Sequence, residues 1–191
     1  MSGFMKIAAK CAAFSSSIFK AFFEINDDES FTSGSKKVGL TAARRVVYVI
    51  ADYWTALACA ALVGSLKYWG LSFWGIAVAT WLFDFLVAFA FMVASEKSGQ
   101  DITLGESFRR VADVIHSSSK LAGFVSMIGL TIKATIWDGP EQVAIFFKKE
   151  LGSMKMMTFV VFALTFVQGV FWAWVYGLGY ESVAELLKGL V

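Results

Sequence analysis

Three ionisable side chains stand inside long apolar stretches of this 191-residue chain, and they are the first candidates for chemistry. They are Asp52, Asp84 and Lys133. An ionisable group is costly in an apolar layer, so it is retained where it is paired, protonated or in contact with water. Asp84 lies near the middle of its stretch. The sequence leaves two interpretations open for it: an internal structural pair, or a position on a path for protons or other cations.

The spacing suggests partners for each of these groups. With a rise of about 1.5 Å per helical residue, Asp84 would lie roughly 15 Å and Lys133 roughly 20 Å from the same membrane boundary, so the flexible lysine could reach the carboxylate. Lys133 could instead extend toward the outer surface beside Asp138. Asp52 follows Arg45 by two helical turns, and it could pair with that arginine or lie in the hydrated headgroup zone.

The stretches that contain these residues are each about as long as the roughly 20 residues that an α-helix needs to cross a membrane. They cover residues 46–66, 69–94, 120–137 and 156–176. Hydrophobic residues make up 58% of the chain and the mean hydropathy is +0.65, well outside the range of soluble domains. The sequence therefore predicts an all-α integral membrane protein, with a transmembrane domain over residues 46–177 that forms an antiparallel bundle of four helices.

Shorter amphipathic segments are expected around these spans. Residues 1–25 place lysines and apolar side chains on different faces, which is typical of a helix lying in the membrane interface. Residues 26–45 have the composition of a polar and basic linker, and residues 178–191 fit a C-terminal amphipathic helix. Capping patterns at residues 103–106 and 138–141 predict short interfacial helices between the spans. The basic side chains expected to contact lipid headgroups are Lys6, Lys10, Lys20, Arg44 and Arg45.

Lys and Arg also predict the orientation, because they gather on the cytoplasmic side of membrane proteins. Their distribution over the four expected spans favours both termini on the cytoplasmic or equivalent side, although three lysines between the third and fourth spans oppose this. The sequence does not identify the membrane.

Small residues recur at four-residue spacing and predict where helices approach closely, since close packing is a main source of helix association in lipid. Gln168 and Gly169 in the fourth stretch fit an interhelical hydrogen bond beside a close packing point. The stripes in the first and second stretches comprise Ala56, Ala60, Gly64, Gly75 and Ala79.

Signals of catalysis are absent from the sequence. It has no nucleophile with a nearby base, no glycine-rich phosphate loop and no metal-ligand spacing, and the net charge of +2 is too small to favour nucleic acid. We therefore expect neither an enzyme nor a cofactor. The leading expectation is a non-catalytic membrane subunit or scaffold, with the lipid bilayer and other subunits as its partners. The alternative is an oligomeric ion channel or small transporter with a polar path through Asp84.

Overall fold

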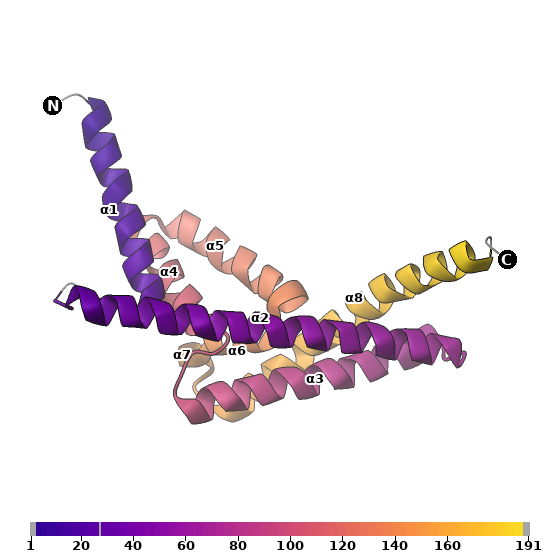
Figure 1. Cartoon of the computed structure of the whole chain (residues 1–191). Helices are drawn as coiled ribbons and strands as arrows, with labels where there is room; N and C mark the ends of the chain where they lie inside the picture. The colour runs from indigo at the N-terminus through magenta and orange to yellow at the C-terminus, as the bar shows by residue number, and fades with distance from the viewer. Residues whose placement is uncertain (1–2, 27, 189–191) are drawn as a thin grey trace.

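A computed structural model describes residues 3–26 and 28–188, and these residues form helices without any β-strand (Figure 1). The helices are α1 (Gly3–Phe23), α2 (Phe31–Tyr68), α3 (Phe73–Ser98), α4 (Gly105–Ser118), α5 (Lys120–Lys133), the π-helical turn η1 (Ala134–Asp138), α6 (Pro140–Phe146), α7 (Lys148–Leu151) and α8 (Met154–Lys188). Four segments are long and apolar enough to cross a membrane: Phe31–Tyr68, Phe73–Ser98, Lys120–Asp138 and Met154–Ser182. The expectation of an all-helical chain with four apolar helices is therefore confirmed.

The helices α2, α3 and α8 form one long unit, in which α3 runs antiparallel to both of the others. The Trp81 indole on α3 donates to the carbonyl oxygen of Phe162 on α8 at 3.0 Å. A Cβ atom at Gly169 would lie 2.8 Å from the backbone of Trp81, so only glycine allows α3 and α8 to approach this closely. At the far end of the unit, Lys67 on α2 donates to the Gly177 carbonyl oxygen at 2.9 Å and pairs with Glu181.

The third candidate span does not run along this unit to its far end. After α5 the backbone widens into η1, and Gly139 with a φ of 110° and Pro140 then end the helix and turn the chain. The returning helix α6 packs Ala144 and Ile145 into a buried cluster with Ala88, Met92, Met157 and Val161. On α7, Lys148 then pairs with Glu96 near the end of α3. The chain thus folds back to the end from which it entered (Figure 1).

The sequence predicts four transmembrane helices in an antiparallel bundle, and of the four candidate spans Lys120–Asp138 is the one that does not run along the whole unit. Three helices run the full length of the unit, and the segment from α5 to α7 enters and returns at one end. The Gly139-Pro140 pair gives the physical reason, because it interrupts the apolar stretch after α5. The two ends of the described chain lie at opposite ends of the molecule (Figure 1). The side of the membrane on which each terminus lies stays a prediction.

The boundaries of the flanking segments also differ from the expected ones. Most of the linker expected at residues 26–45 is helical, because the Ser30 side chain caps α2 by accepting from the Ser33 backbone N–H at 3.4 Å. Lys37 on this extension pairs with Glu29 and donates to the Glu24 carbonyl oxygen at 2.8 Å, which connects α2 to the end of α1. At the other end of the chain, α8 continues unbroken to Lys188, so residues 178–188 are part of that helix. Residues 189–191 lie outside the described part.

The short helices α1 and α4 pack against each other beside the end of the unit where α2 begins. The Phe22 and Phe108 rings meet edge to face at 5.8 Å, and Arg110 donates to the Ala21 carbonyl oxygen at 2.9 Å. The cap of α4 is not the expected pair of residues 103 and 106. Asp101 accepts instead, from the backbone N–H and the hydroxyl of Ser107 at 2.8 and 2.9 Å.

Candidate functional site

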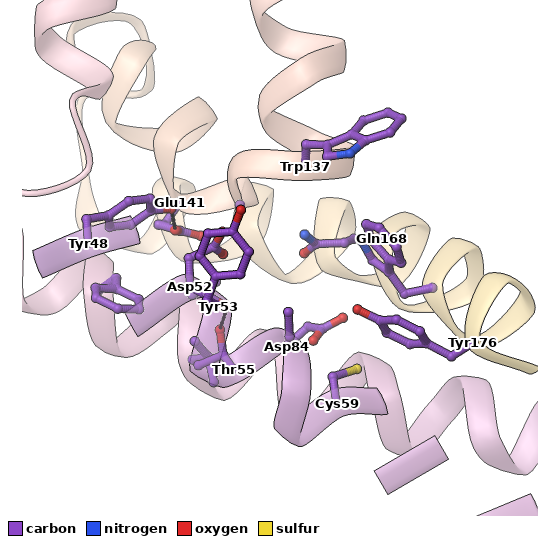
Figure 2. A pocket seen from close by; sticks show the side chains of 16 residues that line it. Tyr48, Asp52, Tyr53, Thr55, Cys59, Asp84, Trp137, Glu141, Gln168 and Tyr176 are labelled. Carbon is purple, nitrogen blue, oxygen red and sulfur yellow. Dashed lines mark hydrogen bonds between the residues drawn. The ribbon is translucent and has the colours of Figure 1, made fainter. Parts of the chain in front are cut away.

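A cavity of about 360 Å³ lies where the turn between η1 and α6 meets α2, α3 and α8 (Figure 2). Three carboxyl groups line it, one from each of three elements: Asp52 from α2, Asp84 from α3 and Glu141 from α6. Each of its sixteen lining residues belongs to the described part of the chain, and none of them is Lys or Arg. The cavity is therefore acidic, and its wall supplies no positive charge.

Helical periodicity places the polar groups of the wall on one face of each helix. On α2, Tyr48, Asp52 and Cys59 are separated by one and two turns, so their side chains share a face. On α8, Gln168 and Tyr176 are two turns apart and face the same cavity. The two helices thus present polar groups toward Asp84 from opposite sides (Figure 2).

Within the described part of the chain, the Asp84 carboxyl group lacks a hydrogen-bond partner at one of its two oxygens. Its Oδ2 atom is buried and has no hydrogen-bond partner among the described residues. The Cys59 thiol lies beside this carboxyl group, and the Tyr176 hydroxyl points toward it (Figure 2). A buried carboxylate without a positively charged partner carries a large desolvation cost. Asp84 therefore favours a proton or a positively charged ligand as its missing partner.

Tyr48 joins the turn to α2 deep in the protein. Its ring is 2% exposed, and its hydroxyl lies 2.6 Å from Oε1 of Glu141, a side chain that is 3% exposed. The same hydroxyl also bonds to the carbonyl oxygen of Asp138. A phenol has a single hydrogen, so it can donate to only one of these two oxygens. Both contacts are satisfied together when Glu141 carries a proton and donates to Tyr48.

The interrupted helix leaves backbone carbonyl groups that need donors, and aromatic side chains supply them. The Trp172 indole on α8 donates to the Ile136 carbonyl oxygen at 2.9 Å, and Tyr48 bonds to that of Asp138. These two bonds fix the turn against α8 and α2. They also occupy two of the carbonyl oxygens that the turn places beside the cavity.

The ionisable residues singled out in the sequence separate in the structure. Asp52 and Asp84 line the same cavity, whereas Lys133 is exposed and pairs with Asp138. The pair between Lys133 and Asp84 is not formed, and the alternative in which the lysine extends beside Asp138 is the one observed. Arg45 does not form an ion pair with Asp52 in the described part, and its guanidinium lies 5.6 Å from the centre of the Tyr48 ring.

The residues expected at helix contacts take varied positions. Ala56 lines the cavity. A Cβ atom added at Gly64 would lie 3.8 Å from the Tyr180 ring on α8. At Gly75, an added Cβ would meet only side chains of the preceding turn, and Ala60 and Ala79 are half-buried. Gly169, next to Gln168, is where α8 approaches the Trp81 backbone of α3. This close helix contact between α3 and α8 lies outside the predicted stripes.

The basic residues expected at lipid headgroups divide between α1 and α2. Lys10 is exposed on α1 and Lys20 is half-buried there, whereas the side chain of Lys6 lies outside the described residues. Arg44 and Arg45 are half-buried on α2, close to the level of Tyr48.

A second group of charges lies at the end of the unit where α3 finishes and α8 begins. Lys148 approaches Glu96 at 2.7 Å and Glu106 at 3.6 Å. Arg109 approaches Glu150 at 2.6 Å and Asp113 at 3.0 Å. The hydrogen bond with Glu96 raises the pKa of the Lys148 ammonium above its ordinary value. These ion pairs connect α3, α4 and α7, so they hold the returning segment in place.

Sequence reasoning missed Glu141, Cys59 and Tyr176 as members of the site. Glu141 had been assigned to an interfacial helix, and only its position directly after Gly139-Pro140 could have indicated a carboxyl group at the tip of a turn. Cys59 and Tyr176 give no such signal, because their common environment depends on how α2 and α8 pack.

A tight metal centre is not present in the described ranges, where no group of three or more His, Cys, Asp or Glu side chains converges on one point. The three carboxyl groups are instead spread around the cavity. Compared with known proteins, the chain matches no protein-family model, no curated protein and no solved structure. The geometry of the cavity is consequently the main guide to function.

Proposed function

We propose that this protein binds cations in a cavity within the membrane, as a small transporter or channel with a polar path through Asp84. The observation that carries this proposal is an acidic cavity in an apolar helical unit, with three carboxyl groups and no lysine or arginine in its wall. Structural carboxylates at such a depth are normally neutralised by a basic partner. Here the missing charge is best supplied by a ligand that enters and leaves.

The fold-back of the third candidate span supports this proposal. Irregular backbone at membrane depth is tolerated where it is enclosed by protein or lines a water-filled cavity. Broken helices in transporters occupy such positions and surround the transported species. In this protein, Gly139 and Glu141 at the turn both line the cavity. We therefore infer that α2, α3 and α8 cross the bilayer, and that the segment from α5 to α7 enters it and returns.

This topology has a consequence for the ends of the chain. Three crossings place the N-terminal helix and the end of α8 on opposite sides of the membrane. The amphipathic helices α1 and α4 then lie at one interface, where their basic residues contact lipid headgroups. Cysteine accessibility labelling tests this inference: Cys11 in the native chain and a cysteine introduced at Glu181 should react from opposite sides. Reaction of both from one side would contradict three crossings.

The cation-binding proposal is tested by measuring charge movement in reconstituted protein. Proteoliposomes on a solid-supported membrane are exposed to jumps in proton, Na⁺, K⁺ and choline concentration. We expect the wild type to give an electrical transient for at least one of these cations, and we expect Asp84→Asn to abolish it. Asp28→Asn, which removes an exposed carboxylate far from the cavity, is the matched control and should leave the transient unchanged.

A scaffold subunit is the second candidate function, and one observation favours it. Large aromatic side chains outside the cavity are strongly exposed on α2 and α3, including Trp54 at 69% and Trp74 at 65%. Lipid contact accounts for these side chains, and so does a partner subunit. If no cation produces a transient with the wild type, and Asp84→Asn instead reduces the recovery of a larger assembly, the scaffold role is supported and the cation path is wrong.

A further inference from the structure

We propose that the ligand of this cavity is a small organic cation carrying an ammonium group. This inference rests on the proposed cation-binding function and adds the chemical class of the ligand. Three features of the cavity support it: its size, its aromatic wall and the absence of the oxygen cage that a bare metal ion requires.

The size of the cavity fits a small solute. Its volume of about 360 Å³ falls at the lower end of the roughly 300–1,000 Å³ typical of small-molecule sites. A single water occupies about 30 Å³ in the liquid, and a dehydrated monovalent ion is of similar size. A bare ion would therefore leave most of the cavity to water, whereas an organic cation with several carbon atoms can fill it.

Aromatic rings form one corner of the cavity. The Trp172 and Tyr176 rings are stacked with centroids 5.1 Å apart, and Trp137 meets Trp172 edge to face at 6.4 Å. All three residues line the cavity. Rings of this kind attract ammonium groups through the negative potential of their faces, and such cages recognise quaternary ammonium ligands. The Asp84 carboxyl group lies beside the Tyr176 hydroxyl, at the edge of this corner, and supplies the countercharge (Figure 2).

The oxygen atoms that could coordinate a metal ion are in contrast dispersed, and two carbonyl oxygens at the turn already accept a hydrogen bond. Alkali and alkaline-earth ions take about six or more oxygen ligands at short distance. The carbonyl groups of Ile136 and Asp138 at the turn accept from Trp172 and Tyr48. No three of the acidic, thiol or imidazole groups in the described ranges converge on one point. An ammonium group needs only a carboxylate and ring faces.

The experiment measures binding to the full chain in lipid nanodiscs by calorimetry, in a buffer free of amines. The probes are choline, tetraethylammonium, Na⁺, K⁺ and Ca²⁺. We expect at least one of the two organic cations to bind more tightly than the metal ions. Asp84→Asn should weaken its binding at least about tenfold, because a charge-assisted contact is lost. Tyr176→Leu should weaken it about 2- to 30-fold, the range of a cation–π contact, whereas Tyr176→Phe should retain most of the affinity.

Tyr68→Leu is the matched control, since Tyr68 is 78% exposed and lies outside the cavity. Circular dichroism of each variant shows whether the helices are intact. If Tyr176→Leu does not fold, the comparison of Tyr176→Phe with Trp137→Leu at the rim replaces it, with the same expected order of affinities.

The outcomes separate this inference from the function on which it rests. Binding of a metal ion that depends on Asp84, with no binding of either organic cation, would overturn the ligand class and leave the cation-binding function intact. Binding of the organic cations that Tyr176→Leu and Trp137→Leu do not weaken would also overturn the aromatic recognition. If none of the probes binds to the wild type, both the ligand class and the cation-binding proposal are wrong.

Discussion

Two regions of this protein differ in whether their carboxyl groups are paired with a basic side chain. At the end of the unit where α3 finishes, Glu96, Glu106 and Glu150 each approach a lysine or arginine within 4 Å. In the cavity, Asp84 and Asp52 have no such partner among the described residues, and the Oδ2 atom of Asp84 is buried. The carboxylates at the partly exposed end are thus paired with basic side chains. Those in the cavity are not, although desolvation of an unpaired carboxylate costs more there.

This difference indicates separate roles for the two regions. A charge pair at the exposed end fixes the position of α4 and α7 and contributes little free energy on its own. An unpaired carboxyl group in the cavity is retained at a cost in stability, which is expected where a ligand or proton completes the site. Substitutions in the two regions should therefore differ in sign as well as in size.

The largest effect is expected from the turn that carries Glu141 to the cavity. Gly139→Ala places a Cβ atom 2.4 Å from Oε1 of Glu141, in a backbone conformation with a φ of 110° that alanine rarely adopts. We expect the free energy of unfolding to fall by about 3 kcal/mol or more. Thermal unfolding in detergent measures this, and Gly129→Ala on α5, where an added Cβ meets nothing within 4 Å, is the control. Equal stability of the two variants would mean that the turn is not constrained as described.

The next effect comes from the hydroxyl that joins the turn to α2. Tyr48→Phe removes the partner of both Glu141 and the Asp138 carbonyl oxygen in a buried position. Leaving buried polar groups unsatisfied costs about 1–3 kcal/mol, so the melting temperature should fall clearly. Tyr53→Phe is the control, because Tyr53 is 69% exposed. A variant as stable as the wild type would show that water replaces the hydroxyl.

A direct contrast between the two regions follows from removing one carboxylate charge in each. Asp84→Asn removes a charge without a partner, so stability should be unchanged or higher while cation binding is lost. Glu96→Gln removes a paired charge, so stability should fall by about 0.5–1 kcal/mol while cation binding is retained. Thermal unfolding measures the stability of both variants, and calorimetry measures their cation affinity. Loss of stability in Asp84→Asn would assign that carboxylate a structural role.

The same contrast explains which parts of the protein the sequence could predict. Apolar stretches of about 20 residues predict the four candidate spans, because length and hydropathy are local properties of the sequence. The start of α2 was missed because the Ser30 cap lies within a polar run that resembles a linker. The Gly139-Pro140 pair predicts the start of a short helix, but the sequence does not show that this helix returns along the unit, because that depends on its packing against α3 and α8.

The sequence predicts only those site residues whose charge lies within an apolar stretch. Asp52 and Asp84 stood out because each is a charge within an apolar stretch. Glu141 lies beyond the stretch and enters the cavity through the turn, and Tyr176 is one aromatic residue among many on α8. Their grouping depends on the packing of α6 and α8 against α2 and α3, which involves residues far apart in the chain.

The smallest effect is expected at the exposed end, where Lys148 is 43% accessible. Lys148→Met removes its contacts with Glu96 and Glu106, and the loss should be at most about 1 kcal/mol and should shrink in high salt. Because the pKa of Lys148 is raised in the folded protein, its contribution is complete below the ordinary value near 10.5 and is lost as pH rises through the raised value. Unfolding scans of wild type and variant should therefore differ at neutral pH and low salt, and converge in strong alkali. A difference that is independent of salt would show that Lys148 acts through the packing of its aliphatic chain.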